Sequence, residues 1–137
     1  MKCFLLAMSL LAIATFSTAQ SVPYNVVFDI TSKDTVDQRM VIRWLNDISK
    51  ADAGAKLEVV FYALSLDLVT KGKSIAAMEV EELAKNKNIS FKVCEVAMKK
   101  LNIDKSQLIA GVETVPDGIY EIVLKQKEGY AYIKATR

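Results

Sequence analysis

The chain has 137 residues, of which 52% are apolar, with only five glycines and two prolines. This length and composition fit one globular domain with a buried core and exclude a disordered chain. Eighteen basic and sixteen acidic residues leave a formal charge of +2. No basic run is long enough to follow a phosphate backbone, so nucleic acid is not an expected partner.

The first twenty residues differ in character from the rest. One lysine precedes an apolar stretch over residues 3–16, and Ser17 and Ala19 supply the small residues of a signal-peptidase site. The stretch is shorter than the roughly 20 residues that a membrane-spanning helix needs, although a retained anchor is the alternative. We therefore predict a signal peptide over residues 1–19 and a mature domain over residues 20–137. The mature chain should have no membrane span and should be periplasmic or secreted.

Strand and helix patterns alternate along the predicted mature chain. Residues 24–30 are rich in β-branched and aromatic side chains and predict the first strand. From Asp34 the apolar residues recur at helical spacing, which predicts a helix that Asp34 caps and that ends near Gly54. Residues 57–63 predict the second strand, and a loop through Gly72 should follow it.

The second half of the chain continues the alternation. Apolar residues alternate with Ser90 and Lys92, which is typical of a strand with one covered face. Asp117 is a candidate helix N-cap, and Gly118 gives the backbone freedom beside it. In chain order the predicted elements are a helix over residues 76–84, a strand over 89–93, a helix over 95–101, a strand over 112–115, a helix after 116–118 and a strand over 130–134.

Strands that alternate with helices over short connections predict parallel βαβ units with right-handed crossovers. The expected class is α/β, with a mostly parallel five-stranded sheet flanked by helices. The third and fifth strands alternate in polarity, whereas strands covered on both faces are nearly all apolar. Either these strands lie toward an edge of the sheet, or another subunit covers part of one face.

Cys94 is the one thiol that remains once cleavage removes Cys3. It directly follows the third predicted strand and precedes a helix, and ligands of parallel sheets gather at the carboxyl ends of the strands. The helix N-terminus would stabilise a thiolate, whereas Glu95 and apolar surroundings would oppose it. Because a lone thiol cannot form an internal disulfide, Cys94 is a packed side chain, an intermolecular disulfide partner or a reactive group.

Three segments resemble the DsrE/DsrF-like family: FKVCEVAM at residues 91–98, VETVPDGIYEIV at 112–123 and QKEGYAYIK at 126–134. The resemblance covers nearly the whole predicted mature chain. It implies a flavodoxin-like parallel sheet and a trimeric or hexameric assembly. It also implies that Cys94 stands where better-understood members carry sulfane sulfur in a sulfur relay.

The chain departs from the family pattern after the second strand. Many relatives have a His-Gly pair there, whereas this chain reads Ala63, Leu64, Ser65 and contains no histidine. Histidine is the usual general base near neutral pH, so other side chains must serve if there is catalysis. The family resemblance is therefore firmer than the activity it implies.

Two functions remain open from the sequence. The first is an exported sulfur carrier or sulfurtransferase-like protein that holds a persulfide on Cys94 and passes the sulfur to an acceptor thiol. It would need no metal or organic cofactor, and its partners would be further copies of itself and a thiol or persulfide protein. The second is a non-catalytic oligomeric binding or scaffold protein in which Cys94 is only packed.

The other conspicuous residues have ordinary interpretations. The glutamates at 79, 81 and 82 are expected on a solvated helix face, since no histidine or cysteine accompanies them. Lys71 and Lys73 could attract an anion, but a solvated loop is the simpler prediction. Tyr130 and Tyr132 share one strand face and are expected to make packing or subunit contacts.

Overall fold

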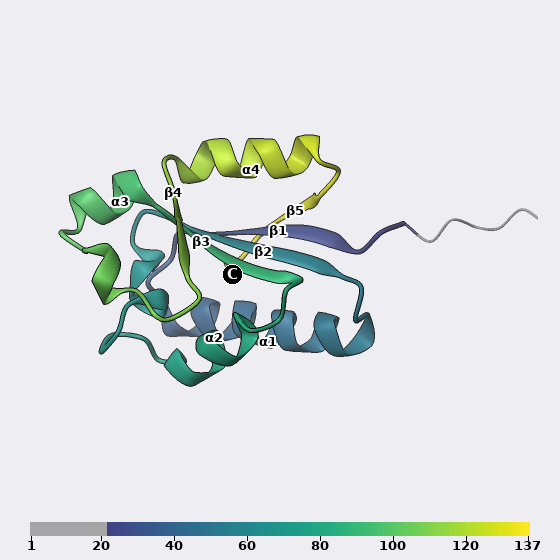
Figure 1. Cartoon of the computed structure of the whole chain (residues 1–137), viewed down its shortest axis with the longest axis horizontal. Helices are drawn as coiled ribbons and strands as arrows, with labels where there is room; N and C mark the ends of the chain where they lie inside the picture. The colour runs from purple at the N-terminus through teal and green to yellow at the C-terminus, as the bar shows by residue number, and fades with distance from the viewer. Residues whose placement is uncertain (1–21) are drawn as a thin grey trace, which may run out of the picture.

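The fold is a five-stranded, wholly parallel sheet with helices on both faces, seen in the computed structural model of the chain (Figure 1). The structure describes residues 22–137. The signal peptide predicted at residues 1–19 lies outside the described residues. The predicted α/β class and parallel five-stranded sheet are confirmed.

The observed elements follow the predicted order closely. Asp34 caps the first helix as expected, because its side chain accepts a hydrogen bond of 2.7 Å from the amide of Val36. The elements are β1 (Asn25–Ile30), α1 (Thr35–Ala51), β2 (Lys56–Phe61), η1 (Ser65–Val69), α2 (Ala77–Leu83), β3 (Ile89–Cys94), α3 (Glu95–Lys100), η2 (Lys105–Gln107), β4 (Glu113–Val115), α4 (Gly118–Lys127) and β5 (Ala131–Lys134).

The segment after β2 differs from the loop that the sequence predicts. It begins with the buried 3₁₀ turn η1, in which Leu66 and Leu68 are fully buried. The hydroxyl of Ser65 fixes this turn by donating to the carbonyl oxygens of Ile30, at 2.7 Å, and Tyr62, at 2.9 Å. These long-range bonds connect η1 to the ends of β1 and β2, and no local sequence pattern predicts them.

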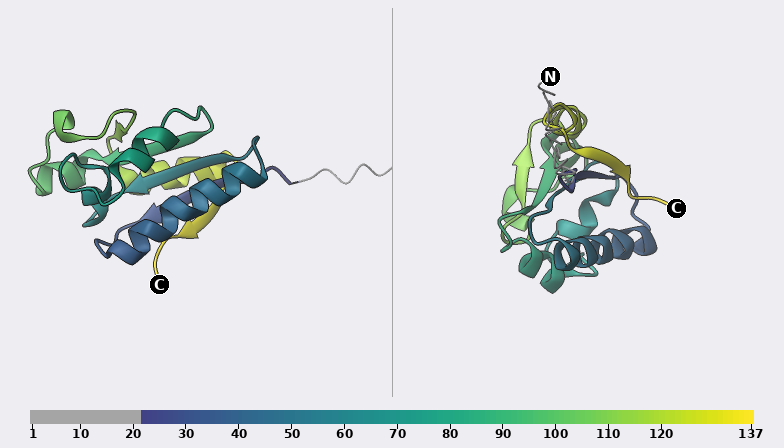
Figure 2. Two further views of the ribbon diagram at one scale, coloured as in Figure 1. Left: turned by 90° about the horizontal axis from the view of Figure 1, so that it is seen from below. Right: turned by 90° about the vertical axis from the view of Figure 1, so that its right-hand side faces the viewer.

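The strand order is β4-β3-β2-β1-β5. The chain moves outward from β1 to β4 with α1 and α2 on one face, then returns to β5 with α4 on the other face (Figures 1 and 2). Connections between parallel strands of one sheet are almost always right-handed crossovers. All five strands therefore point their carboxyl ends at the same edge of the sheet, and α4 runs back across the sheet from that edge.

The two faces of the sheet differ in polarity. The face under α1 and α2 carries the main core, in which the rings of Phe61 and Phe91 stack with their centroids 6.1 Å apart. The α4 face has a small apolar cluster of Val27, Val60 and Ile122. Polar side chains from the strands occupy much of the remaining α4 face, because a single helix covers it.

This difference explains the two alternating strands. β5 is an edge strand, and all four of its residues are exposed. β3 is an inner strand, and its polar residues Ser90 and Lys92 lie on the α4 face, beside Glu58 and Glu113 respectively. The fifth strand is thus at an edge, and the third lies next to the edge strand β4, with its polar residues on the more polar face.

Candidate functional site

Cys94 lies where three elements meet. It is the last residue of β3 and the N-cap of α3, and it forms no disulfide. Only 6% of its surface is exposed. A β-carbon added at Gly118, the first residue of α4, would lie 3.1 Å from the Cβ of Cys94. The absence of a side chain at Gly118 therefore lets α4 begin directly against the thiol residue.

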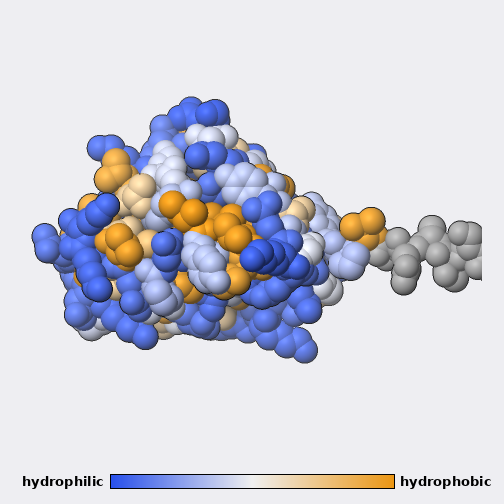
Figure 3. Space-filling view, turned by 90° about the horizontal axis from the view of Figure 1, so that it is seen from above, coloured by the Kyte–Doolittle hydropathy of each residue, from blue (hydrophilic) through white to orange (hydrophobic). Residues whose placement is uncertain are grey.

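A cleft of about 360 Å³ opens beside Cys94. Its walls come from the segment after β2, from α3 and from the start of α4, and they are mainly apolar. The charged side chains in the wall are Lys100 and Asp117. Exposed apolar side chains surround the cleft, and Figure 3 shows apolar surface gathered on the α4 side of the molecule. The exposed apolar residues that line the cleft are Leu64, Val96, Leu101 and Ile119.

The nearby acidic residues Asp117 and Glu95 have hydrogen-bond partners of their own. Asp117 accepts from the amides of Ile119, at 2.8 Å, and Tyr120, at 3.2 Å, so it is the helix cap that the sequence predicts. Glu95 accepts a 3.0 Å hydrogen bond from the hydroxyl of Thr114 on β4 and does not line the cleft.

Cys94 lies at the start of the short helix α3. Cys94 makes no side-chain hydrogen bond to the first turn of α3. The first amide groups of a helix have no partner within the helix, and they place partial positive charge at its N-terminus. The thiol therefore lies at the positive end of a short helix, as the sequence predicts.

A cluster of Asp29, Tyr62 and Tyr132 lies next to the cleft, and the sequence analysis did not find it. Asp29, at the end of β1, is 3% exposed and accepts a 2.6 Å hydrogen bond from the hydroxyl of Tyr132 on β5. Its other carboxyl oxygen has no partner among residues 22–137. An aspartate within the otherwise apolar end of the first strand was the signal that could have indicated this cluster.

Tyr62 connects this cluster to the thiol. It follows β2 directly and lines the cleft together with Cys94. Burial, and then the neighbouring Asp29, raise the pKa of Tyr62 above its ordinary value of 10, with smaller effects from Tyr132 and Cys94. The Tyr62 phenol therefore keeps its proton at neutral pH.

Ala63 forms the next part of the cleft wall in an unusual backbone conformation. Its φ is 55°, in the left-handed region that favours glycine. The segment reads Ala63, Leu64, Ser65, and the chain contains no histidine. The turn beside the thiol is therefore built with some backbone strain and without an imidazole.

The other residues singled out in the sequence lie elsewhere. Lys71 donates to the carbonyl of Ser106 at 2.8 Å, and Lys73 pairs with Asp67 at 3.6 Å, so neither lysine faces the Cys94 cleft. Within residues 22–137 no helix has the length and apolarity needed to cross a membrane.

Tyrosines and glutamates that the sequence analysis singled out contact neighbouring side chains. Tyr130 packs near Lys125, whose ammonium lies 5.3 Å from the centre of its ring, whereas Tyr132 bonds Asp29. Glu79 pairs with Arg39 and Glu82 with Lys85 at the surface, as a solvated helix face would. Tyr132 is thus more than the packing residue that the sequence indicates.

Together these features define a parallel α/β protein with a thiol at the carboxyl edge of its sheet. The chain belongs to the DsrE/DsrF-like family, whose model matches residues 25–135.

The solved structures most similar in fold include three of bacterial or archaeal origin. A protein of unknown function, MTH1491 from Methanobacterium thermoautotrophicum, is 28% identical, with a TM-score of 0.75 over 81% of this chain and 98% of that chain. The ychN protein from E. coli is 13% identical, with a TM-score of 0.68 over 82% and 98%. The protein of unknown function BT1422 from Bacteroides thetaiotaomicron is 15% identical, with a TM-score of 0.65 over 81% and 94%. The last two comparisons concern the fold alone. Comparison with curated proteins gives no match.

Proposed function

We propose that this protein is a sulfur carrier that holds sulfane sulfur as a persulfide on Cys94. The observation that carries the proposal is the position of Cys94 at the carboxyl end of β3, on an open and mainly apolar cleft, in a member of the DsrE/DsrF-like family. The sequence resemblance aligns Cys94 with the sulfur-bearing cysteine of better-understood members.

The transfer needs no external oxidant or metal. The Cys94 thiolate attacks the terminal sulfur of a persulfide or polysulfide donor. A new S–S bond forms at Cys94 and the terminal S–S bond of the donor breaks, so that a persulfide leaves as a thiolate and a polysulfide leaves one sulfur atom shorter. An acceptor thiolate then attacks the outer sulfur of the Cys94 persulfide. The S–S bond to Cys94 breaks, and the Cys94 thiolate is restored for another cycle.

Three features of the cleft support this chemistry. The N-terminus of α3 favours the negative charge of a thiolate or persulfide at Cys94. The protonated phenol of Tyr62 lies in the same cleft and can donate a hydrogen bond to that charge. The apolar walls, including Leu64 and Ile119, limit water around the bound sulfur.

A second candidate function is a binding or scaffold protein in which Cys94 is inert. The observation that favours it is the low exposure of Cys94, at 6%. A packed thiol of this kind behaves as a small apolar side chain. The two candidates predict opposite behaviour of the folded protein toward thiol reagents.

Sulfur loading of the full chain separates the candidates. The protein carries Cys3→Ser, so that Cys94 is its one thiol, and is incubated with sodium polysulfide. We expect the intact mass to rise by whole sulfur atoms and to return to its starting value on addition of dithiothreitol. The further variant Cys94→Ser should take up no sulfur and should keep the circular dichroism spectrum of the parent.

Two tyrosine variants test whether the cleft contributes to sulfur loading. Tyr62→Phe keeps the ring and removes the donor, so we expect sulfur loading to slow several-fold. Tyr120→Phe is the matched control, because Tyr120 is an exposed residue of α4 that does not line the cleft, and its loading rate should be unchanged. Folded protein that takes up no sulfur, and that iodoacetamide alkylates only after denaturation, would leave the scaffold function in place of the carrier.

Export belongs to the same proposal. If residues 1–19 are a signal peptide, the secreted protein begins at or near Gln20, and N-terminal mass analysis of exported material checks this. The sulfur donor and acceptor would then be thiol or persulfide proteins outside the cytoplasm. Material that keeps Met1 in a membrane fraction would contradict this part of the proposal.

A further inference from the structure

A second cleft lies on the α4 face, toward the amino ends of the strands. It has a volume of about 390 Å³, within the range of small-molecule sites. Its walls come from β2, from β3 and the residues just before it, from Glu121 and Lys125 of α4, and from Tyr130. The apolar cluster of Val27, Val60 and Ile122 occupies the same sheet face between this cleft and the one at Cys94. The two clefts share no lining residue.

The floor of this second cleft is a buried carboxyl group with unfilled hydrogen-bonding capacity. The side chain of Glu58 is 4% exposed. Its Oε2 accepts a 2.8 Å hydrogen bond from the hydroxyl of Ser90 and lies 3.9 Å from the ammonium of Lys125. Its Oε1 is buried and makes no hydrogen bond to any residue from 22 to 137, although the carboxyl group of Glu121, which also lines the cleft, is close enough to raise the pKa of Glu58. Buried polar atoms of this kind are uncommon in proteins, so a bound donor would satisfy an existing deficit.

The mouth of the cleft is lined by lysines. Lys92 pairs with Glu113 on β4, and Lys125 pairs with Glu128 at 2.9 Å. Lys56 and Lys87 also line the cleft.

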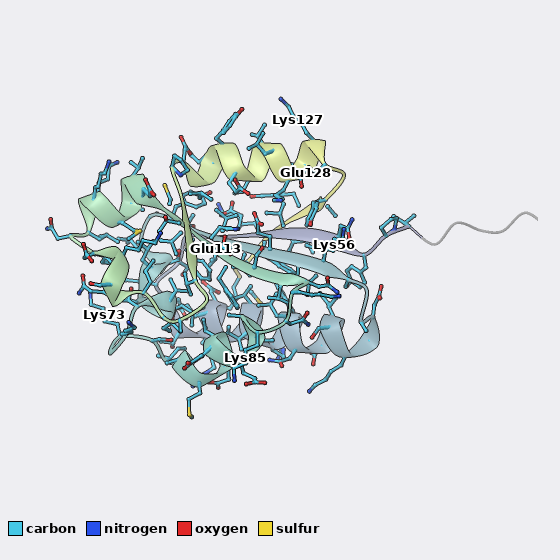
Figure 4. All side chains as sticks on the ribbon, viewed as in Figure 1. Lys56, Lys73, Lys85, Glu113, Lys127 and Glu128 are labelled. Atoms are coloured by element: carbon cyan, nitrogen blue, oxygen red, sulfur yellow. The ribbon has the colours of Figure 1, made fainter. Side chains whose placement is uncertain are left out.

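These two lysines lie at the starts of neighbouring strands. Leu57 of β2 is in register with Ile89 of β3, which brings Lys56 close to the residues just before β3. Neither Lys56 nor Lys87 forms an ion pair with a described residue. Figure 4 shows Lys56 at the end of the molecule where α4 ends, at Glu128. The mouth therefore offers cationic groups that can receive an anion.

We propose that this cleft is a binding site for a small organic acid that also carries a hydroxyl or ammonium group. The hydroxyl or ammonium donates to Oε1 of Glu58 at the floor, and the acid group lies among the lysines at the mouth, chiefly Lys56 and Lys87. A ligand with only one of these groups satisfies only one end of the cleft. The site is separate from the proposed sulfur chemistry at Cys94.

Three kinds of probe test this assignment by nuclear magnetic resonance on the full chain. L-serine and L-lactate carry both an acid group and a donor, propionate carries only the acid, and ethanolamine carries only donors. We expect at least one of L-serine and L-lactate to shift the amide signals at the starts of β2 and β3. Its affinity should exceed those of propionate and ethanolamine at least tenfold.

Variants then separate binding from general charge effects. Glu58→Gln and Lys87→Gln should each weaken the L-serine or L-lactate affinity at least fivefold. Lys73→Gln is the matched control, since Lys73 pairs with Asp67 outside this cleft, and its affinity should equal that of the parent (Figure 4). Circular dichroism verifies that each variant is folded.

The parent protein decides the outcome even if one variant fails to fold. The proposal is overturned if neither two-group probe shifts the signals of this cleft, if propionate binds equally well, or if Lys73→Gln and Lys87→Gln weaken binding equally. Cys94→Ser should leave the affinity of the two-group probe unchanged. Failure here is thus distinguishable from failure of the sulfur-carrier proposal.

Discussion

Glu58→Gln should stabilise the protein above about pH 7 and leave its stability almost unchanged near pH 4. Burial on the α4 face raises the pKa of the Glu58 carboxyl from 4.5 to about 7. The hydrogen bond from Ser90 and the charge of Lys125 lower it in part, and the nearby Glu121 raises it further. Glutamine has a similar shape and keeps a carbonyl acceptor for Ser90, but it carries no charge.

The sign of the effect follows from proton binding. The folded protein holds the Glu58 proton more tightly than the unfolded chain, so the free energy of unfolding falls as pH rises from 4.5 to about 7. Above that window both states are ionised, and the full cost of the buried charge is present. At about 1.4 kcal/mol for each pKa unit, this cost amounts to about 3.5 kcal/mol, which is the upper limit of the gain from Glu58→Gln.

Urea denaturation of the two proteins between about pH 4 and pH 8 measures this effect. The quantity of interest is the difference in unfolding free energy between variant and parent, because contributions of other titrating groups cancel in it. Glu79→Gln is the matched control, since Glu79 is an exposed residue paired with Arg39, and it should change stability by less than about 1 kcal/mol. A Glu58→Gln variant that is less stable than the parent at pH 8, or a difference that does not change with pH, would refute the reasoning.

Three further predictions concern the Cys94 cleft and its surroundings. Gly118→Ala would place a Cβ 3.1 Å from the Cβ of Cys94 and 3.1 Å from a methyl of buried Val60, so we expect a loss of about 1 kcal/mol or more in urea denaturation, despite the better helix propensity of alanine. Unchanged or increased stability would mean that the start of α4 can shift freely. Ala63→Gly should raise the unfolding free energy by up to about 1 kcal/mol, because φ at Ala63 is 55°, and a decrease would show that the turn is unstrained. The apolar side chains exposed around the cleft, such as Ile119 at 62%, predict self-association, which light scattering should detect at micromolar concentrations; a clean monomer there would count against it.

Much of the fold follows from local patterns in the sequence. The helix α1 and its cap Asp34, the cap Asp117 of α4, and the order of strands and helices were all predicted from spacing and residue type. The position of Cys94 between β3 and α3 was predicted in the same way. These features depend on interactions within a few residues, which is why a single sequence is enough to indicate them.

The buried turn after β2 shows where local patterns stop being sufficient. Ser65 is a polar residue in a segment that the sequence presents as a loop, yet it is fully buried. Its hydroxyl bonds the carbonyl of Ile30, thirty-five residues earlier in the chain. The turn forms because β1 and β2 are neighbours, and the sequence alone does not say which strands are neighbours.

The sequence by itself determined the α/β class, the family and the place of the thiol at the end of a strand. Only the tertiary structure decided what surrounds that thiol and what else the sheet carries. Asp29 bonds Tyr132, which lies 103 residues later, because β5 pairs with β1 rather than with β4. Glu58 lies beside Ser90 and below Lys125 because β2, β3 and α4 pack together. Strand alternation tells which residues of one strand share a face, but the strand order and the helix laid over that face decide which of them meet.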